Sequence, residues 1–132
     1  MKNILQSLTL VLVLSNLCFS QYSPEWINRY EYLNGSWDEP YAMAADSAGN
    51  VYVTGKSYGE STGFDICTVK YNSLGNLQWT ARYTGPNLAN DVPYAIATDK
   101  TGNVYVAGKS YGGSSDSDFT VIKYNSAGAQ QW

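Results

Sequence analysis

Short stretches of alternating apolar and polar residues follow one another along most of this 132-residue chain. Residues 51–57 read Val-Tyr-Val-Thr-Gly-Lys-Ser, the period-2 pattern of a half-buried strand. Residues 46–50 and 72–76 combine Asp or Asn with Gly, which is typical of tight hairpin turns. No stretch shows a helical 3.6-residue stripe, so the pattern predicts an all-β chain. We expect strands at 23–32, 40–46, 51–57, 65–71, 77–83, 93–99, 104–110 and 118–124, with a longer loop at 58–63.

The whole pattern repeats after 53 residues, without a gap, from Trp26 to Trp79 and again to Trp132. A fixed period indicates a repeat architecture, and one propeller blade takes roughly 40–50 residues in four strands. Blades pack on both faces, which explains why residues 66–69 are apolar on both sides. The period therefore predicts four-stranded antiparallel β-propeller blades, and residues 91–132 should superpose on residues 38–83.

The repeated motif resembles that of a known family. Asp-x-x-Gly-Asn-Val-Tyr-Val-x-Gly-Lys-Ser, followed by Lys-Tyr-Asn-Ser-x-Gly and Gln-Trp, is similar to the SBBP repeat, a beta-propeller repeat of bacterial secreted and surface proteins. Its Gly-Asn-Val-Tyr-Val core is also similar to NHL repeats, but the period fits SBBP better. The resemblance implies a ring of about seven blades and an extracellular or cell-surface location. It implies no catalytic residues and no cofactor.

The chain divides into four parts on this reading. Residues 1–20 resemble a signal peptide cleaved between Ser20 and Gln21, which predicts a secreted or surface-exposed protein. A buried core helix, or a lipid anchor on Cys18, are the alternatives for this stretch. We expect residues 21–36 to be a lone outer strand of a ring-closing blade, 37–83 the first blade, and 90–132 a second blade cut in its fourth strand. The chain then reads as an N-terminal fragment of a longer protein, with self-assembly of several copies as the alternative.

Composition narrows the chemistry. The net charge is −3, which argues against nucleic acid and anionic membrane as partners. The chain has no histidine, which removes Ser-His-Asp and Cys-His sites and imidazole metal ligands. Cys67 is the one cysteine left after signal cleavage, so no intramolecular disulfide forms, and we expect a buried, unreactive thiol.

Charged residues recur once per repeat, which favours structural roles over a unique active site. The spacing of the aspartates does not match a calcium loop, so no metal is predicted. We expect the repeated lysines and arginines to form ion pairs with the repeated aspartates. These positions are Asp38/Asp91, Asp46/Asp99, Asp65/Asp118, Arg29/Arg82, Lys56/Lys109 and Lys70/Lys123.

The longer and less repeated loops, 33–39, 58–64, 84–92 and 111–117, share one edge of a propeller and are the expected recognition surface. We predict a non-catalytic extracellular module that binds or scaffolds a protein or glycan. One alternative is a structural surface-layer repeat. Another is a carboxylate-based glycan-active enzyme that pairs Asp38 with Glu39 or Glu60 at roughly 5–9 Å. The candidate ligand-face residues are Tyr32, Trp37, Asp38, Tyr58, Phe64, Asp91 and Tyr111.

Overall fold

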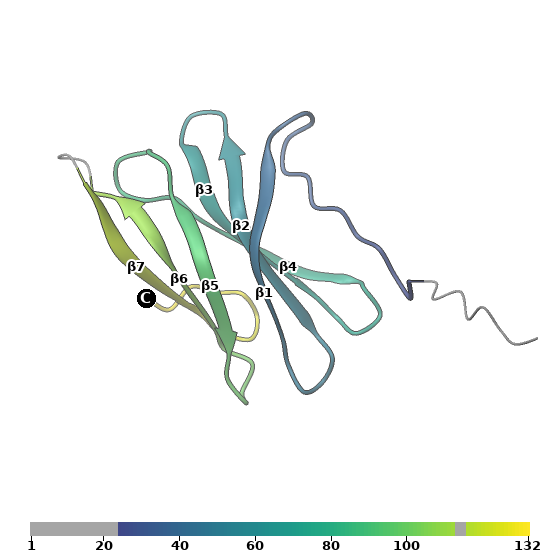
Figure 1. The fold of residues 1–132 in the computed structure, drawn as a ribbon. Helices are drawn as coiled ribbons and strands as arrows, with labels where there is room; N and C mark the ends of the chain where they lie inside the picture. Colours follow the sequence, from purple (N-terminus) through teal and green to yellow (C-terminus); the bar gives the residue numbers. More distant parts are fainter. Residues whose placement is uncertain (1–23, 113–115) are drawn as a thin grey trace, which may run out of the picture.

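The computed structural model describes residues 24–112 and 116–132, and their regular structure consists of seven β-strands in two separate antiparallel sheets (Figure 1). No described segment is a helix that is long and apolar enough to cross a membrane. The expected signal peptide, with Ser20 and Gln21, lies outside the described residues. The strands are β1 (Asp38–Ala45), β2 (Val51–Gly59), β3 (Gly63–Tyr71), β4 (Leu77–Tyr83), β5 (Val92–Thr98), β6 (Val104–Tyr111) and β7 (Ser117–Tyr124).

The first sheet has four strands in the order β1-β2-β3-β4, and the second has three in the order β5-β6-β7. The two sheets share their register: Ser57 faces Asp65 in the first, and Ser110 faces Asp118 in the second. A bulge interrupts the pairing of β1 with β2 just after Pro40, and the same irregularity follows Pro93 in β5. The predicted fold class and the predicted equivalence of the two repeats are therefore confirmed.

A fourth strand begins in the second sheet. Gln130 forms an isolated bridge with Tyr124, and the Lys123 N–H donates to the Trp132 carbonyl at 2.9 Å. In the first sheet the equivalent of Lys123, Lys70, faces Trp79 on β4. Residues 129–132 thus occupy the start of the position that β4 fills in the first sheet.

The core lies between the sheets, and each sheet uses its two faces differently. The downstream face, which the first sheet turns toward the second, carries Tyr52 and Ile66, both completely buried. They pack against Val106 and Ile122 on the face that the second sheet turns toward the first. We call this the upstream face of the second sheet. The upstream face of the first sheet carries a separate cluster around Cys67 and Val69. Burial on both faces confirms the expectation from the doubly apolar sequence of β3.

The expected strand at 23–32 is not formed in the described residues, which have no regular structure from Pro24 to Trp37. This segment runs along the first sheet on the side away from the second sheet (Figure 1). Its position nevertheless matches the repeat. The Trp26 ring lies 6.0 Å from that of Tyr71, as the Trp79 ring lies 6.1 Å from that of Tyr124. The segment occupies the place of an outer strand, and the described chain has no neighbouring strand to pair with it.

The expected loop at 58–63 was also too long. β2 continues to Gly59 and β3 begins at Gly63, so Tyr58 and Phe64 are paired strand residues. Gly63 adopts a φ of 74°, which only glycine adopts easily and which lets the tighter turn form.

Candidate functional site

The repeated turn aspartates hold the hairpins. The Asp46 carboxylate accepts hydrogen bonds from the Ala48 and Asn50 N–H groups at 2.9 and 3.0 Å, and from the Tyr52 hydroxyl at 2.9 Å. Burial acts to raise the pKa of Asp46, but its hydrogen bonds, first among them the one from the Asn50 side-chain amide at 2.8 Å, outweigh burial and lower that pKa. Burial, followed by the bond to Asp46, raises the pKa of Tyr52 to about 12.

Asp99 repeats this arrangement with Asn103, Thr101 and Tyr105. The side-chain hydrogen bonds from Asn103 and then Thr101 are the largest causes that hold the pKa of Asp99 below its usual range. Within the described residues no group of three His, Cys, Asp or Glu side chains could hold a metal ion. The Asp46 and Asp99 carboxylates thus stabilise the hairpin turns in which they lie, through hydrogen bonds to the backbone of those turns.

A second polar cluster lies at the other end of the first sheet. Arg82 on β4 donates through Nε to the buried carboxylate of Asp65 at 2.7 Å. Its Nη1 and Nη2 reach the hydroxyl and the carbonyl oxygen of Ser57, each at 2.7 Å. Thr62 adds a hydrogen bond to Asp65 at 2.7 Å. This ion pair is the expected one between a repeated arginine and a repeated aspartate.

The repeated lysines do not follow that expectation. Lys70 places its ammonium 5.2 Å from the ring centre of Tyr52, and Lys123 lies 5.4 Å from that of Tyr105. These are cation–π contacts across neighbouring strands. Lys56 forms its ion pair with Glu39 at 3.0 Å, and Glu39 is not a repeated residue. The prediction of lysine–aspartate pairs is therefore wrong for Lys56 and Lys70.

An aromatic row crosses the first sheet at the edge where the longer loops lie. The Tyr58 N–H donates to the Trp37 carbonyl at 3.0 Å, and Tyr58 faces Phe64 in the β2–β3 register. The rings of Tyr58 and Phe64 meet edge to face at 5.4 Å. Trp37 is 71 % exposed and Tyr58 is 42 % exposed. We call Trp37, Tyr58 and Phe64 the aromatic row.

Charged and further aromatic groups extend this row toward the second sheet. The Lys56 ammonium lies 4.7 Å from the ring centre of Phe64 and 5.8 Å from that of Tyr41. Tyr41 also donates weakly to Glu39 at 3.4 Å, and its ring meets that of Tyr94 edge to face at 6.3 Å. The result is a continuous, partly exposed surface of aromatic rings around one ion pair, suited to a ligand with both apolar and hydroxyl or amide groups.

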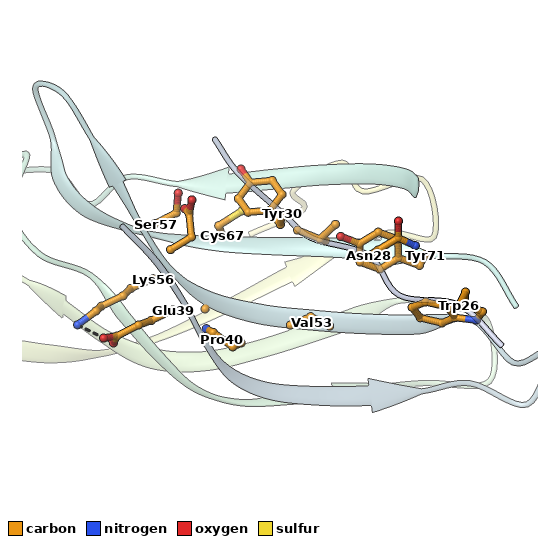
Figure 2. A pocket seen from close by; sticks show the side chains of 13 residues that line it. Trp26, Asn28, Tyr30, Glu39, Pro40, Val53, Lys56, Ser57, Cys67 and Tyr71 are labelled. Atoms are coloured by element: carbon orange, nitrogen blue, oxygen red, sulfur yellow. Dashed lines mark ion pairs between the residues drawn. The ribbon is translucent and has the colours of Figure 1, made fainter. Parts of the chain in front are cut away.

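A groove of about 280 Å³ opens on the upstream face of the first sheet (Figure 2). Tyr30 and Cys67 lie on one side of it, while the Glu39–Lys56 pair lies apart from them (Figure 2). Cys67 is buried, and burial is the main cause that raises the pKa of its thiol. Its expected burial is confirmed.

A comparison with known protein families finds one match in each repeat. A model of a beta-propeller repeat, SBBP, matches residues 25–61 and 78–120, which is more than half of the chain. The chain belongs to the SBBP beta-propeller repeat family. No curated protein matches it significantly. Each matched SBBP segment begins just before a repeated tryptophan, Trp26 or Trp79, and continues into the strands of the following sheet.

The SBBP fold brings part of the predicted ligand face together. Trp37, Tyr58 and Phe64 form the aromatic row, and the exposed Tyr32 stacks its ring on the Arg82 guanidinium at 4.1 Å. Tyr111, the repeat counterpart of Tyr58, is half-buried.

The two predicted aspartates play other parts. Asp91 is 1 % exposed and accepts a hydrogen bond from the Gly85 N–H at 2.6 Å, so it is not on the surface. Asp38 is half-buried, lines the groove, and accepts from the Ser36 hydroxyl at 3.3 Å. The structure does not bring these two into the aromatic row.

Sequence reasoning missed Tyr41, Lys56 and Tyr94 as members of this SBBP surface. Tyr41 and Tyr94 lie in the strands predicted at 40–46 and 93–99 and recur at the repeat spacing, so no pattern set them apart as surface residues. Both are exposed because they are the unpaired residues of the bulges that follow Pro40 and Pro93, where the alternation of faces is interrupted. The proline at each of these positions is the sequence signal that could have shown it.

Proposed function

We propose that this SBBP chain is a non-catalytic module that binds or scaffolds a protein or glycan outside the cell. The observation that carries the proposal is the aromatic row, because two of its members break the repeat. Trp37 and Phe64 stand where the second repeat has Asn90 and Ser117. Residues that only hold a blade together recur in each repeat, whereas an aromatic present in one blade alone indicates a role specific to that blade.

The chemistry of this surface supports a ligand with flat apolar faces and polar edges. Exposed Trp and Tyr rings supply contact area, and the Glu39–Lys56 pair supplies hydrogen-bonding groups beside them. Asp38 and Glu39 do not share one site, because they are consecutive strand residues and point to opposite faces of the sheet. This arrangement favours binding over glycan hydrolysis, which needs two carboxylates facing one bond.

A pair of substitutions tests the binding surface without disturbing the blade. Trp37→Asn with Phe64→Ser gives the first repeat the residues that the second already has. Binding to insoluble polysaccharides such as chitin and cellulose, measured by co-sedimentation, should weaken by about 30-fold or more, because a buried aromatic contact is worth ~2 kcal/mol or more. Cross-linking mass spectrometry on exporting cells provides the protein arm of the test, with Trp37 and Phe64 required for the cross-link.

Leu74→Ala is the matched control. Leu74 is an exposed apolar residue in the hairpin at the opposite edge, and its repeat counterpart is Ala127. Equal loss of binding in the control and in the double variant would remove the aromatic row as the binding surface. The proposed location has its own test: the protein recovered from the medium or cell surface should begin at Gln21 by mass spectrometry.

A further inference from the structure

One exposed turn places an asparagine directly before a glycine. Asn34 and Gly35 are both exposed, and the Ser36 N–H closes the turn by donating to the Leu33 carbonyl at 2.8 Å. This is the one Asn-Gly pair in the 132 residues. We propose that Asn34 is a self-modification site, at which the backbone nitrogen of Gly35 attacks the side-chain amide and converts Asn34 into aspartate and isoaspartate, with the Glu31 carboxylate as general base.

The reaction needs water as its only co-reactant. The Gly35 N–H gives up its proton, and its nitrogen forms a bond to Cγ of Asn34. The bond from Cγ to the side-chain amide nitrogen breaks, and that nitrogen leaves as ammonia with the proton. The attack lies within one chain, which favours it over attack by water on the amide. Water then opens the cyclic succinimide, giving aspartate when the bond from Cγ is cleaved and isoaspartate when the original peptide bond is cleaved.

The local backbone permits this attack. Gly35 has a φ of 79° and Asn34 has a negative φ, which is the pattern of a type II turn with glycine at its third position. The peptide between the two residues must rotate before the ring can close, and the rotation breaks the one backbone hydrogen bond that closes the turn. A Cβ at Gly35 would meet nothing within 4 Å, so no packed neighbour opposes the movement.

The Asn34 side chain is free to react. The side-chain hydrogen bonds of the turn use Glu31, Ser36 and Asp38, and none of those in the described part of the chain involves the Asn34 amide. By contrast, the amides of Asn50 and Asn103 donate to the aspartates of their own turns, at 2.8 and 2.7 Å. An amide held in that way loses a partner when it turns toward the next backbone nitrogen.

Glu31 is placed to accept the proton. Its Oε1 accepts a hydrogen bond from the Gly35 N–H at 3.0 Å, which is within the reach of a general base. An ionised carboxylate only accepts hydrogen bonds, so the proton moves toward it as the nitrogen attacks. Glu31 is exposed, so its side chain can follow the nitrogen while the turn opens.

The second repeat keeps the asparagine but lacks the groups that make it reactive. The counterparts of Glu31, Asn34 and Gly35 are Thr84, Asn87 and Leu88. The Leu88 side chain crowds its own backbone nitrogen, and Thr84 has no carboxylate. Asn87 should therefore stay intact under conditions in which Asn34 is converted.

The conversion changes the loop that leads into β1. Either product adds a negative charge near Glu31 and Asp38, and isoaspartate also lengthens the main chain by one carbon atom. The described residues up to Trp37 have no regular structure, so no strand is broken. The site thus gives the loop a slow, irreversible change of charge and shape.

Peptide mapping by mass spectrometry tests the proposal on the full chain, sampled over weeks at about neutral pH. The peptide with Asn34 should gain the mass difference between an amide and a carboxylic acid and separate into aspartate and isoaspartate forms. The peptides with Asn76 and Asn87 should not change. Asn76 is a strict internal control, because it is exposed but is followed by Leu77.

Two variants test the assigned groups. Glu31→Gln should slow the conversion by about threefold or more, a smaller effect than that of a buried general base because solvent also takes up the proton at an exposed turn. Gly35→Leu copies the second repeat, where Leu88 adopts a φ of 52°, and should stop the conversion. Glu60→Gln is the matched control, because it removes another exposed carboxylate from the same repeat.

Three results would overturn the proposal. The first is an intact Asn34, or a conversion of Asn76 at the same rate. The second is a conversion that Glu31→Gln leaves unchanged or speeds up, or that Glu60→Gln slows equally. The third is a glycan on Asn34, because Asn34-Gly35-Ser36 is also an acceptor triplet for N-linked glycans and a glycosylated amide is not free to react.

Discussion

Removing Arg82 should destabilise the first sheet more than any other single change to a charged residue. Arg82 satisfies the buried carboxylate of Asp65 and two oxygens of Ser57, and only 17 % of its side chain is exposed. Arg82→Met keeps the length and the apolar stem but leaves the Asp65 charge buried without a counter-charge. Such a loss costs ~3–5 kcal/mol, a large part of the ~5–15 kcal/mol that stabilises a typical domain.

Urea unfolding, followed by tryptophan fluorescence and by far-ultraviolet circular dichroism, measures this cost. The matched control is Lys56→Met, which breaks the more exposed pair with Glu39 and should lower the urea midpoint far less. Arg82→Met/Asp65→Leu removes both charges, so it should be less destabilised than Arg82→Met alone by ~1 kcal/mol or more.

The reasoning fails if Arg82→Met costs no more than Lys56→Met, or if the double variant loses the sum of its two single losses. Should Arg82→Met not fold, Asp65→Asn gives a milder version of the same test. It keeps the shape and the hydrogen bond from Thr62 while it removes the charge.

Three smaller predictions concern single positions. Because hydrogen bonds hold the pKa of Asp99 low in the folded protein, its contribution to stability is present above the unfolded pKa of ~3.9 and is lost as pH falls through the folded value. Asp99→Asn should therefore flatten the acid side of the stability–pH curve, measured by urea midpoints between about pH 5 and pH 2. The Cys67 thiol, 4 % exposed and with its pKa raised by burial, should react with a thiol reagent only on unfolding, and rapid labelling of the folded protein would contradict this. Gly75→Ala should lower the free energy of unfolding by ~1–3 kcal/mol more than Gly35→Ala, as measured by urea unfolding. Both glycines have φ near 80°, but only at Gly75 would a Cβ meet the Trp26 ring, at 2.7 Å.

Much of the fold could be predicted because the local patterns that indicate strands and turns occur in both repeats. The turn chemistry at Asp46–Asn50 and the tryptophan period set the hairpins and the blade, and β4 begins and ends at the predicted residues. The segment around Trp26 was predicted as a strand because its residues match those of β4. A strand, however, also needs a neighbour, and a local pattern cannot supply one.

The site was harder to predict for a related reason. Asp91 looked like a loop carboxylate, but its bond to the Gly85 N–H draws it into the interior. Lys70 was predicted to pair with a repeated aspartate, but the register of β2 and β3 places its ammonium over the Tyr52 ring. In both cases the partner comes from a contact that the chain order does not show.

The offset between the sequence unit and the sheets has a consequence for how such proteins grow. The second matched segment starts in β4, the outer strand of the first sheet, and continues into the strands of the second sheet, while the first matched segment starts in the stretch before β1 that holds the corresponding place. Duplicating one such unit in a gene therefore inserts an outer strand that completes the sheet before it, and inner strands that await the unit after it. An array can lengthen or shorten by unequal recombination at any internal point, and every interior sheet still receives all of its strands.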